Sequence, residues 1–307
     1  MIMSAPRVSF IICTYNRDVY IRRSMESVAH QDADGHLFEL VLVNNKSTDR
    51  TDVICREFAA AFPHLAFTYV IEENQGLSHA RNRGIKEAKG DILVYLDDDA
   101  FAEKDFVREM ISFYDAHPQV QCTGGKTIPL FEDGKPKWMS HFLMPLVAAV
   151  DLGSVAKPFS RTQFPIGANM AIRRAAIEEV GLFDTALGRK GKNLQGGEEK
   201  DMFNRIRAKG HQPWYLPTTV AHHIIPASRM TVDYIRKQAR GIGFSEAVRT
   251  RAIGYAALGR KHMAELMKWI ASMGLFLYYL ICLQPQKATF LLRFRWWVSQ
   301  GLFWGKE

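Results

Sequence analysis

Short apolar runs alternate with segments of helical periodicity along the first hundred residues. Four runs rich in Val, Ile, Leu and Phe are bounded by polar residues or glycine, which predicts buried strands. These predicted strands cover residues 8–13, 38–43, 65–71 and 91–96. Helices are predicted between them at residues 21–28, 53–58 and 77–88. Strands that alternate with helices form βαβ units, so the pattern predicts an α/β fold with a mostly parallel central sheet.

Three consecutive carboxylates, Asp97, Asp98 and Asp99, follow the fourth apolar run. Three acids side by side repel one another, which is costly unless a cation or hydrogen-bond donors compensate them. Oxygen ligands in this arrangement suit Mg²⁺ or Mn²⁺, and such ions usually bring phosphates with them. The triplet therefore predicts a site for a metal ion and a diphosphate. The alternative is a solvated acidic turn.

Polar residues also follow the other predicted strands of this half of the chain. In a parallel sheet these loops share one edge, so we expect Thr14, Tyr15, Asn44 and Asp49 to converge with the acidic triplet. The sequence contains neither GxGxxG nor GxxxxGK[ST], which excludes the ordinary dinucleotide and P-loop sites. Metal and basic side chains would have to hold the phosphates instead.

Composition narrows the choice of partner. The 307 residues are 47% hydrophobic and carry a net charge of +8, which suits a phosphorylated ligand, an anionic lipid or a nucleic acid. No RNP-type or helix-turn-helix pattern is present, and clustered acids repel phosphate without metal, so no nucleic-acid partner is expected. The four cysteines form no CxxC pair, and the N-terminus lacks a signal-peptide core. Both features favour a reducing, cytoplasmic setting.

Four motifs resemble those of family 2 glycosyltransferases, in the same order and at similar spacing. They are Thr14-Tyr15-Asn16-Arg17, the segment 44–49, the segment 74–82 and Asp97-Asp98-Asp99. The resemblance covers roughly residues 6–225 and implies the GT-A nucleotide-diphospho-sugar transferase fold. One departure is Asn44, where the family usually has Asp. An amide can both donate and accept, which leaves the identity of the nucleotide open.

The resemblance assigns roles along this edge. Thr14 and Tyr15 would line the nucleoside pocket, and Asn44 would meet the edge of the base. Arg81 would lie near the base or the diphosphate, although a helix-surface salt bridge is the alternative. Asp97 would approach the ribose, and Asp99 would hold the metal. The complete expected donor-binding set is Thr14, Tyr15, Asn16, Arg17, Asn44, Asp49, Arg81, Asp97, Asp98, Gly167 and Asn169.

Two glycines precede the acids Glu198 and Glu199 at the start of a predicted helix. Acids in a first helical turn are favoured by the helix dipole, which is a purely structural explanation. The segment also resembles the family's Gly-Glu-Asp motif, whose second acid is the catalytic base. We therefore expect Glu199 as the base, with Glu198 as second candidate and Asp201 as structural support.

A predicted strand near residue 220 ends in His222-His223. Adjacent strand residues face opposite sides, so one of the two should reach the metal, and His222 is slightly favoured; the alternative is a core or surface histidine. The loop-rich segment 132–163 is expected to form part of the acceptor wall or a variable surface excursion.

The C-terminal part is predicted to be helical. Residues 269–283 are almost entirely apolar but short of the ~20 that a membrane span needs, and residues 290–304 are rich in Trp and Arg. We expect interfacial helices that dock on an anionic membrane surface; a helical homodimer interface or core helix is the alternative. The predicted domains are 1–230, a GT-A domain, and 231–307, a helical membrane-associated region.

Together these expectations describe a metal-dependent inverting glycosyltransferase with Mn²⁺ or Mg²⁺ as cofactor. It would move a sugar from a nucleoside-diphosphate-sugar, a UDP-sugar first, to a glycan or lipid-linked acceptor in cell-surface polysaccharide or glycolipid synthesis. Its expected location is the inner face of the cell membrane. One alternative is a sugar nucleotidyltransferase, which would want a Gly-rich loop with a Lys or Arg signature after the first strand. The other is a non-enzymatic basic module docked on the membrane.

Overall fold

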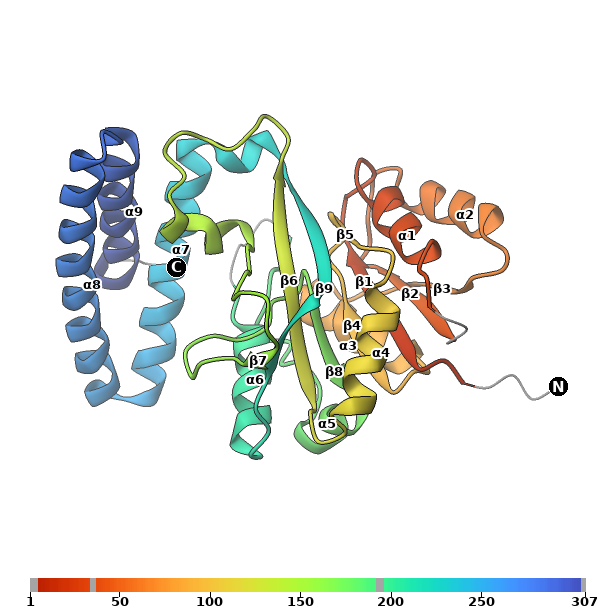
Figure 1. Cartoon of the computed structure of the whole chain (residues 1–307). Coiled ribbons are helices and arrows are strands. Elements are labelled where there is room, and N and C mark those ends of the chain that lie inside the picture. The colour runs from red at the N-terminus through yellow and green to blue at the C-terminus, as the bar shows by residue number, and fades with distance from the viewer. Residues whose placement is uncertain (1–4, 34–36, 192–195, 305–307) are drawn as a thin grey trace. The chain divides into compact units, whose positions relative to one another are not determined.

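The computed structural model describes residues 5–33, 37–191 and 196–304 (Figure 1). These residues form two compact units. The first contains the described residues up to Pro129, those between Ala148 and Asn193, and Gly197–Ile224. The second contains Leu130–Val147 and the described residues from Ile225 onward. The expected acceptor segment 132–163 is therefore divided between the two units.

The parallel half of the sheet follows the predicted pattern closely. Its strands are β1 (Val8–Thr14), β2 (Phe38–Asn44), β3 (Ala66–Ile71) and β4 (Ile92–Tyr95). They lie in the order β3-β2-β1-β4, and all three pairs are parallel. The connecting helices are α1 (Ile21–Ala29), α2 (Thr51–Ala61) and α3 (Leu77–Glu87). Because β1, β2 and β4 run in the same direction, the loops that follow them meet at one edge of the sheet.

The other half of the sheet differs from the predicted parallel arrangement. Strand β8 (Met170–Arg173) pairs antiparallel with both β4 and β6 (Cys122–Phe131). The order continues through β9 (Trp214–Ile225) to β5 (Ala100–Ala102), and β7 (Lys157–Pro158) also pairs with β9. The helices of this half are α4 (Phe106–Ala116), α5 (Arg174–Val180) and α6 (Glu198–Ala208). The sheet is therefore mixed, which hydrophobic periodicity alone could not show because it carries no strand direction.

Alternate residues of the buried strands pack on opposite faces of this sheet. On β1, Phe10 and Ile12 join a cluster with α1, α2 and α4, and the ring of Phe10 lies 5.6 Å from that of Phe106. Ile11 faces the other side, where the cluster includes residues of α3 and α6. Helices thus cover both faces, which explains why the strands read as nearly continuous apolar runs.

The second unit is helical. It contains α7 (Val232–Ile253), α8 (Tyr255–Ile281) and α9 (Pro285–Trp304), together with the short 3₁₀ helices η1 (His141–Val147) and η2 (Ala227–Met230). Helices α7 and α9 lie in backbone contact: a Cβ added at Gly243 would lie 2.0 Å from the carbonyl oxygen of Val298. A Cβ at Gly301 would lie equally close to the carbonyl oxygen of Arg240. These two glycines allow the close crossing.

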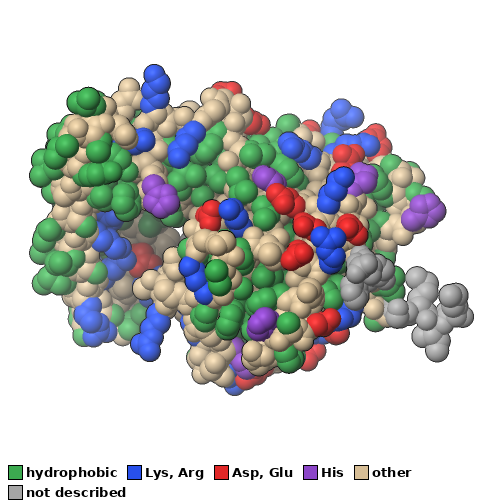
Figure 2. Space-filling view, in the orientation of Figure 1, with side chains coloured by type: hydrophobic (Ala, Val, Ile, Leu, Met, Phe, Trp, Pro, Cys, Tyr) green, Lys and Arg blue, Asp and Glu red, His purple; other side chains and the backbone are tan. Residues whose placement is uncertain are grey.

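Helix α8 is longer than the sequence predicted. Its 27 residues make it long and apolar enough to cross a membrane by length and composition, whereas the apolar stretch alone suggested a segment too short to do so. It also carries a buried carboxylate, because Glu265 accepts from Arg295 (3.1 Å) and Ser299 (3.3 Å) of α9. Large apolar side chains of α8 are nonetheless exposed, and Figure 2 shows hydrophobic atoms gathered over this helix.

Candidate active site

Hydrogen bonds join the loops that follow β1 and β2. The side-chain oxygen of Asn16, which has a left-handed φ of 53°, accepts from the amide of Thr48 at 2.8 Å. The amide of Asn45 donates to the carbonyl of Thr14 at 2.8 Å. Asp49 accepts from the amides of Asp18 (3.1 Å) and Thr51 (3.0 Å). The two loops thus converge as the parallel pattern predicts, and Asn16 and Asp49 hold them together.

The side chain of Asn44 is buried at the end of β2. Its amide nitrogen donates to the hydroxyl of Tyr69 at 2.8 Å, and its oxygen accepts from the amide of Ser47 at 2.8 Å. Tyr69 in turn donates to Asp52 at 2.7 Å. These two bonds use one N–H and one oxygen lone pair of the amide, so the contact with a nucleotide base that the family resemblance implies does not require either bond to break. Tyr15, in contrast, is 38% exposed beside this edge.

The acidic triplet lies where β4 ends, and its side chains meet a histidine from β9. One candidate ligand atom each from Asp97, Asp99 and His223 lie within 4.8 Å of one another. The Nε2 atom of His223 is 3.0 Å from Oδ1 of Asp99, and both side chains are buried. The short strand β5 sets this arrangement, because its antiparallel pairing with β9 places Ala100 opposite His223.

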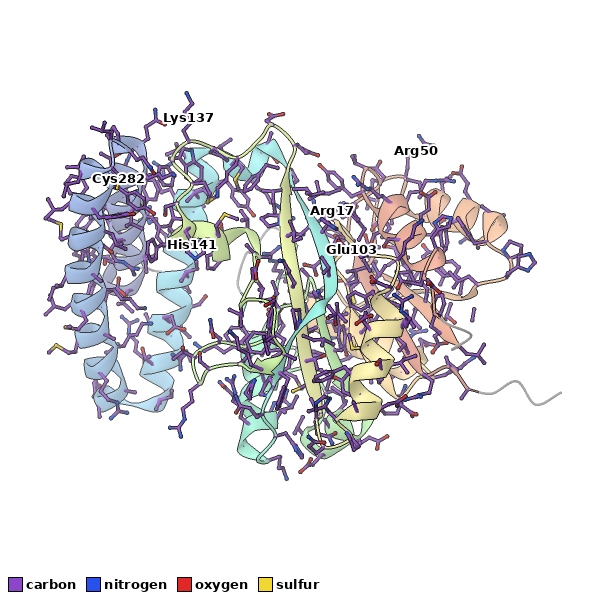
Figure 3. All side chains as sticks on the ribbon, in the orientation of Figure 1. Arg17, Arg50, Glu103, Lys137, His141 and Cys282 are labelled. Carbon is purple, nitrogen blue, oxygen red and sulfur yellow. The ribbon has the colours of Figure 1, made fainter. Side chains whose placement is uncertain are left out.

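The structure corrects the choice between the two histidines. His222 lies on the other face of β9, where its Nε2 atom is 2.9 Å from Glu103 and its ring stacks on Phe101 at 5.2 Å. Figure 3 labels Glu103 near β5. The alternation rule was right that one histidine faces the acids, but it could not say which. In the structure His223 shares a face of β9 with the fully buried Ala221, a difference between the two faces that the sequence does not show.

The guanidinium of Arg17 lies beside the buried acids. It lies 3.4 Å from Oδ1 of Asp98 and 3.4 Å from Oδ2 of Asp99 (Figure 3). Burial and the neighbouring Asp99 carboxylate raise the pKa of Asp98 to about 7, although Arg17 opposes this rise. Asp98 and Asp99 are therefore desolvated, while Asp97 is half-buried, so the triplet is not a solvated turn.

The Asp97, Asp99 and His223 group fits a divalent cation. The three side chains supply two carboxylates and one imidazole at mutually compatible distances. Carboxylate oxygens and imidazole nitrogens are both ligands that divalent cations bind in proteins, so this donor set is compatible with one. Burial and mutual repulsion of the acids give the site an affinity for added positive charge.

A second charged cluster joins α3 to α6. Arg81 is almost fully buried and donates to Oε1 of Glu198 and to Oε1 of Glu199, at 2.9 Å in each case. Burial opposes its charge, but the carboxylates of Glu199 and Glu198 outweigh this and raise the pKa of Arg81. The alternative of a helix-surface salt bridge is wrong, because the ion pair is internal. Arg81 instead positions the two glutamates at the start of α6.

The two glutamates differ in accessibility. The side chain of Glu198 is 5% exposed, and its Oε2 atom is buried without a hydrogen-bond partner among the described residues. The side chain of Glu199 is 23% exposed. Its Oε1 atom accepts from Arg81 and from the amide of Gly167 (2.8 Å), while its Oε2 atom makes no hydrogen bond within the described part of the chain. Glu199 is thus held by one oxygen and presents the other.

The surroundings of Glu199 favour its protonated form. Burial raises its pKa to about 7; the Arg81 ion pair lowers the pKa, and the Glu198 and Asp97 carboxylates raise it. Such a carboxyl can exchange protons near neutral pH, as a general base must. Because Asp97 contributes to the shift, the acidic cluster and Glu199 interact electrostatically.

The remaining predicted residues have mainly structural contacts. Gly167 is required by space, since a Cβ there would lie 2.2 Å from Arg81 and 2.5 Å from Glu199. Asn169 is buried, and its side-chain nitrogen donates to the carbonyls of Lys126 (3.0 Å) and Thr219 (2.9 Å). Asp201 binds Arg205 at 2.8 Å within α6. Thr14 is buried at the end of β1.

Comparison with known proteins identifies the family. The model of the family described as "Glycosyl transferase family 2" matches residues 9–181, more than half of the chain. The chain belongs to glycosyl transferase family 2. It is therefore a glycosyltransferase, as the order of its motifs predicted.

Individual relatives agree with this assignment. The chain is 26% identical over 245 residues to glucosyl-dolichyl phosphate glucuronosyltransferase of Haloferax volcanii, covering 79% of this chain and 77% of the relative. It is 35% identical over 109 residues to the putative glycosyltransferase EpsH of Bacillus subtilis, covering 36% of this chain and 30% of EpsH. The chain thus spans less than a third of the length of EpsH.

Solved structures show the same fold. The mannosyltransferase PcManGT from Pyrobaculum calidifontis, in complex with GDP-Man and Mn²⁺, is similar with a TM-score of 0.63 and 22% identity over 99% of this chain and 89% of its own. Residues 1–349 of S. aureus TarS, in complex with UDP-GlcNAc, give a TM-score of 0.56 and 21% identity over 77% of this chain and 66% of that one. The expected GT-A fold is confirmed.

Proposed function

We propose that this glycosyltransferase moves a sugar from a nucleoside-diphosphate-sugar to an acceptor hydroxyl, with inversion at the anomeric carbon and with Mn²⁺ or Mg²⁺ as cofactor. The observation that carries the proposal is the meeting of Asp97, Asp99 and His223 at the edge where the β1, β2 and β4 loops converge. A bound cation there would neutralise charge that develops on the departing diphosphate.

The residues of the chain divide the remaining work between them. Arg81 and Gly167 hold Oε1 of Glu199, so Oε2 keeps a defined direction and can accept the proton of an acceptor hydroxyl. Loss of that proton makes the hydroxyl oxygen nucleophilic. It then attacks the anomeric carbon from the face opposite the diphosphate, which produces inversion. Tyr15 is exposed at this edge and can stack on the nucleoside base.

Donor and acceptor are proposed by class. A UDP-sugar is the first candidate, as in the TarS complex, and GDP-Man, the ligand of PcManGT, is the principal alternative. A lipid-linked or glycan acceptor fits both the name of the Haloferax relative and the exposed apolar face of α8. We further propose that the helical unit associates with an anionic membrane surface from the cytoplasmic side.

Calorimetric titration tests the cation site directly. UDP and GDP should bind the wild-type protein in the presence of Mn²⁺ and bind at least tenfold more weakly after chelation. Asp99→Asn removes one of the site's charges and should abolish the gain from Mn²⁺. A panel of UDP- and GDP-sugars, followed by measurement of released nucleoside diphosphate, then identifies the donor.

The adjacent histidines provide a matched pair for the same titration. His223→Ala should weaken Mn²⁺-dependent nucleotide binding by about 10–100-fold, the range seen when groups that support a metal site are removed. His222→Ala should leave it within about threefold, because that side chain faces Glu103. The proposed cation site would be refuted if both variants had the same Mn²⁺-dependent nucleotide affinity, or if Mn²⁺ did not change nucleotide binding by the wild-type protein.

A further inference from the structure

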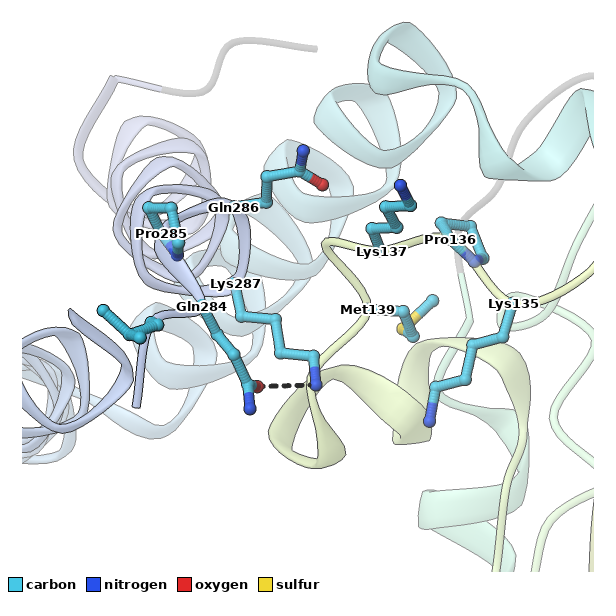
Figure 4. Close-up of a pocket in the computed structure, with 9 residues that line it drawn as sticks. Lys135, Pro136, Lys137, Met139, Gln284, Pro285, Gln286 and Lys287 are labelled. Carbon is cyan, nitrogen blue, oxygen red and sulfur yellow. Dashed lines mark hydrogen bonds between the residues drawn. The ribbon is translucent and has the colours of Figure 1, made fainter. Parts of the chain in front are cut away.

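The helical unit contains a pocket that no step of sugar transfer uses. Its volume is about 500 Å³, and it lies between the loop around Lys135 and the turn that joins α8 to α9. Figure 4 shows the side chains of Lys135 and Lys287 extending from the two walls toward the same side of the pocket. Lys137 extends along the opposite side of the same loop (Figure 4).

The lining of this pocket is positively charged. It includes three lysines, Lys135, Lys137 and Lys287, and none of the described residues that line it is acidic. The ammonium group of Lys287 donates to Oε1 of Gln284 at 2.8 Å, which holds it at the pocket (Figure 4). Gln286 adds a neutral amide to the same wall. Lys135 and Lys287, which extend to the same side of the pocket, suit a phosphate group, and Lys137 adds positive charge nearby (Figure 4).

An exposed apolar side chain, Leu283, lines the pocket where α8 ends. It is 88% exposed and has a left-handed φ of 55°. Helices usually place Gly or Asn in this conformation, because a Cβ there is strained. Ile281, two residues earlier, is 82% exposed. A strained and exposed leucine is costly in water, so its presence beside three lysines points to an apolar environment in front of the turn.

The nearby chain gives the pocket a firm back wall. The ring of Trp138, between Lys137 and Met139, stacks on Phe290 of α9 at 3.9 Å. Phe290 also meets Trp297 edge-on at 5.8 Å. These aromatic contacts attach the lysine-bearing loop to α9 and fix the pocket's two walls relative to each other.

We infer that this pocket binds the phosphate-bearing headgroup of an anionic membrane phospholipid, with the acyl chains against the exposed apolar end of α8. The lysines for the headgroup and Leu283 for the chains line the same pocket, a combination of charge and apolar surface that suits an interfacial site. The inference rests on the membrane association proposed above and makes it specific. It is independent of the cation site and of the sugar donor.

Vesicle co-sedimentation of the whole protein tests this site. The probes are phosphatidylcholine vesicles with and without phosphatidylglycerol, at constant ionic strength. Wild-type protein should partition onto the anionic vesicles. The triple variant K135Q/K137Q/K287Q should partition at least tenfold more weakly onto them and should bind neutral vesicles as the wild type does.

A second triple variant controls for the loss of net charge. R249Q/R251Q/R260Q also removes three positive charges, but at the turn between α7 and α8, the other end of α8. Its partitioning onto anionic vesicles should fall by at most about threefold. If partitioning onto anionic vesicles falls by the same factor in both triple variants, binding depends on net charge alone and the pocket inference is wrong. If the wild-type protein ignores anionic vesicles, the proposed membrane association fails as well, while the transferase proposal is untouched.

Leu283→Asn tests the apolar half of the site and does not depend on the lysines. Asn adopts the left-handed conformation more easily, so thermal stability in solution should stay equal or rise. Vesicle binding should nevertheless fall at least threefold. A variant with unchanged vesicle binding would refute the lipid contact at this turn. Inorganic phosphate that stabilises the protein, together with vesicle binding that the lysine triple variant leaves unchanged, would instead indicate a site for a free anion, which would also overturn the inference.

Discussion

Glu199→Gln is the sharpest test of the proposed mechanism. The substitution keeps the size of the side chain, and the amide oxygen can still accept from Arg81 and from the amide of Gly167. It removes the ability of the side chain to take a proton, together with the negative charge that Glu199 places beside Arg81. The fold and the cation site should therefore remain intact while proton transfer is lost.

The size of the effect follows from the role. A positioned general base contributes about 10²–10⁴-fold in rate, which corresponds to about 3–5 kcal/mol of transition-state stabilisation. The rate of transfer to the acceptor should fall by this factor. The affinity for nucleoside diphosphate with Mn²⁺ should stay within about threefold, because no base proton is involved in that binding.

The pH profile provides an independent measurement on the wild-type enzyme. The base acts in its deprotonated form, and burial raises the pKa of Glu199 to about 7, from an ordinary value of 4.5. Activity should therefore fall about tenfold per unit as the pH decreases below the inflection and should level off above it. Since Asp97 contributes to the raised pKa, a cation at the acidic cluster should move the inflection to a somewhat lower pH. A profile that is flat down to pH 5 would contradict the shift.

Glu198→Gln is the matched control, because it also removes one of the two carboxylates that bind Arg81. Glu198 is almost fully buried, so we expect an acceptor hydroxyl to reach Glu199 and not Glu198. This variant should lose about 1–3 kcal/mol of stability, through a weakened buried network, and less than tenfold in rate. Single-turnover sugar transfer and thermal unfolding of both variants decide the question. Transfer by Glu199→Gln within tenfold of the wild type would refute the assignment of the base.

Three further predictions follow from contacts of the fold. Arg17→Gln removes the positive charge beside the acidic triplet, so titration should show about fivefold tighter binding of Mn²⁺ alone and a lower melting temperature without metal; unchanged Mn²⁺ affinity would contradict this. Gly167→Ala forces Arg81 and Glu199 apart and should lower the transfer rate at least tenfold with little change in nucleotide affinity. Gly243→Ala should destabilise the α7–α9 contact by about 1–3 kcal/mol in denaturant unfolding, whereas Gly241→Ala, which has open space beside it, should be neutral or stabilising.

The sequence pattern predicts most of the first half of the fold. The strands and helices up to residue 96 agree with the apolar periodicity, because both faces of this sheet are covered and burial marks each strand strongly. The polar loops after 8–13, 38–43 and 91–96 converge because parallel strands end at one edge. Hydrophobic periodicity does not give the direction of a strand. The antiparallel pairing of β8 with β4 and β6 was therefore not predicted.

The candidate site was also only partly predictable from the sequence. The sequence by itself determined which residues are candidates for the chemistry: an acidic triplet after a buried strand, a pair of glutamates at a helix start, and two adjacent histidines. Only the tertiary structure decided how they combine, since His223 reaches Asp99 through the pairing of β5 with β9, and Arg81 meets Glu199 across more than a hundred residues. Local patterns arise from neighbours in the chain, whereas these contacts depend on register and packing between distant segments, which no local pattern encodes.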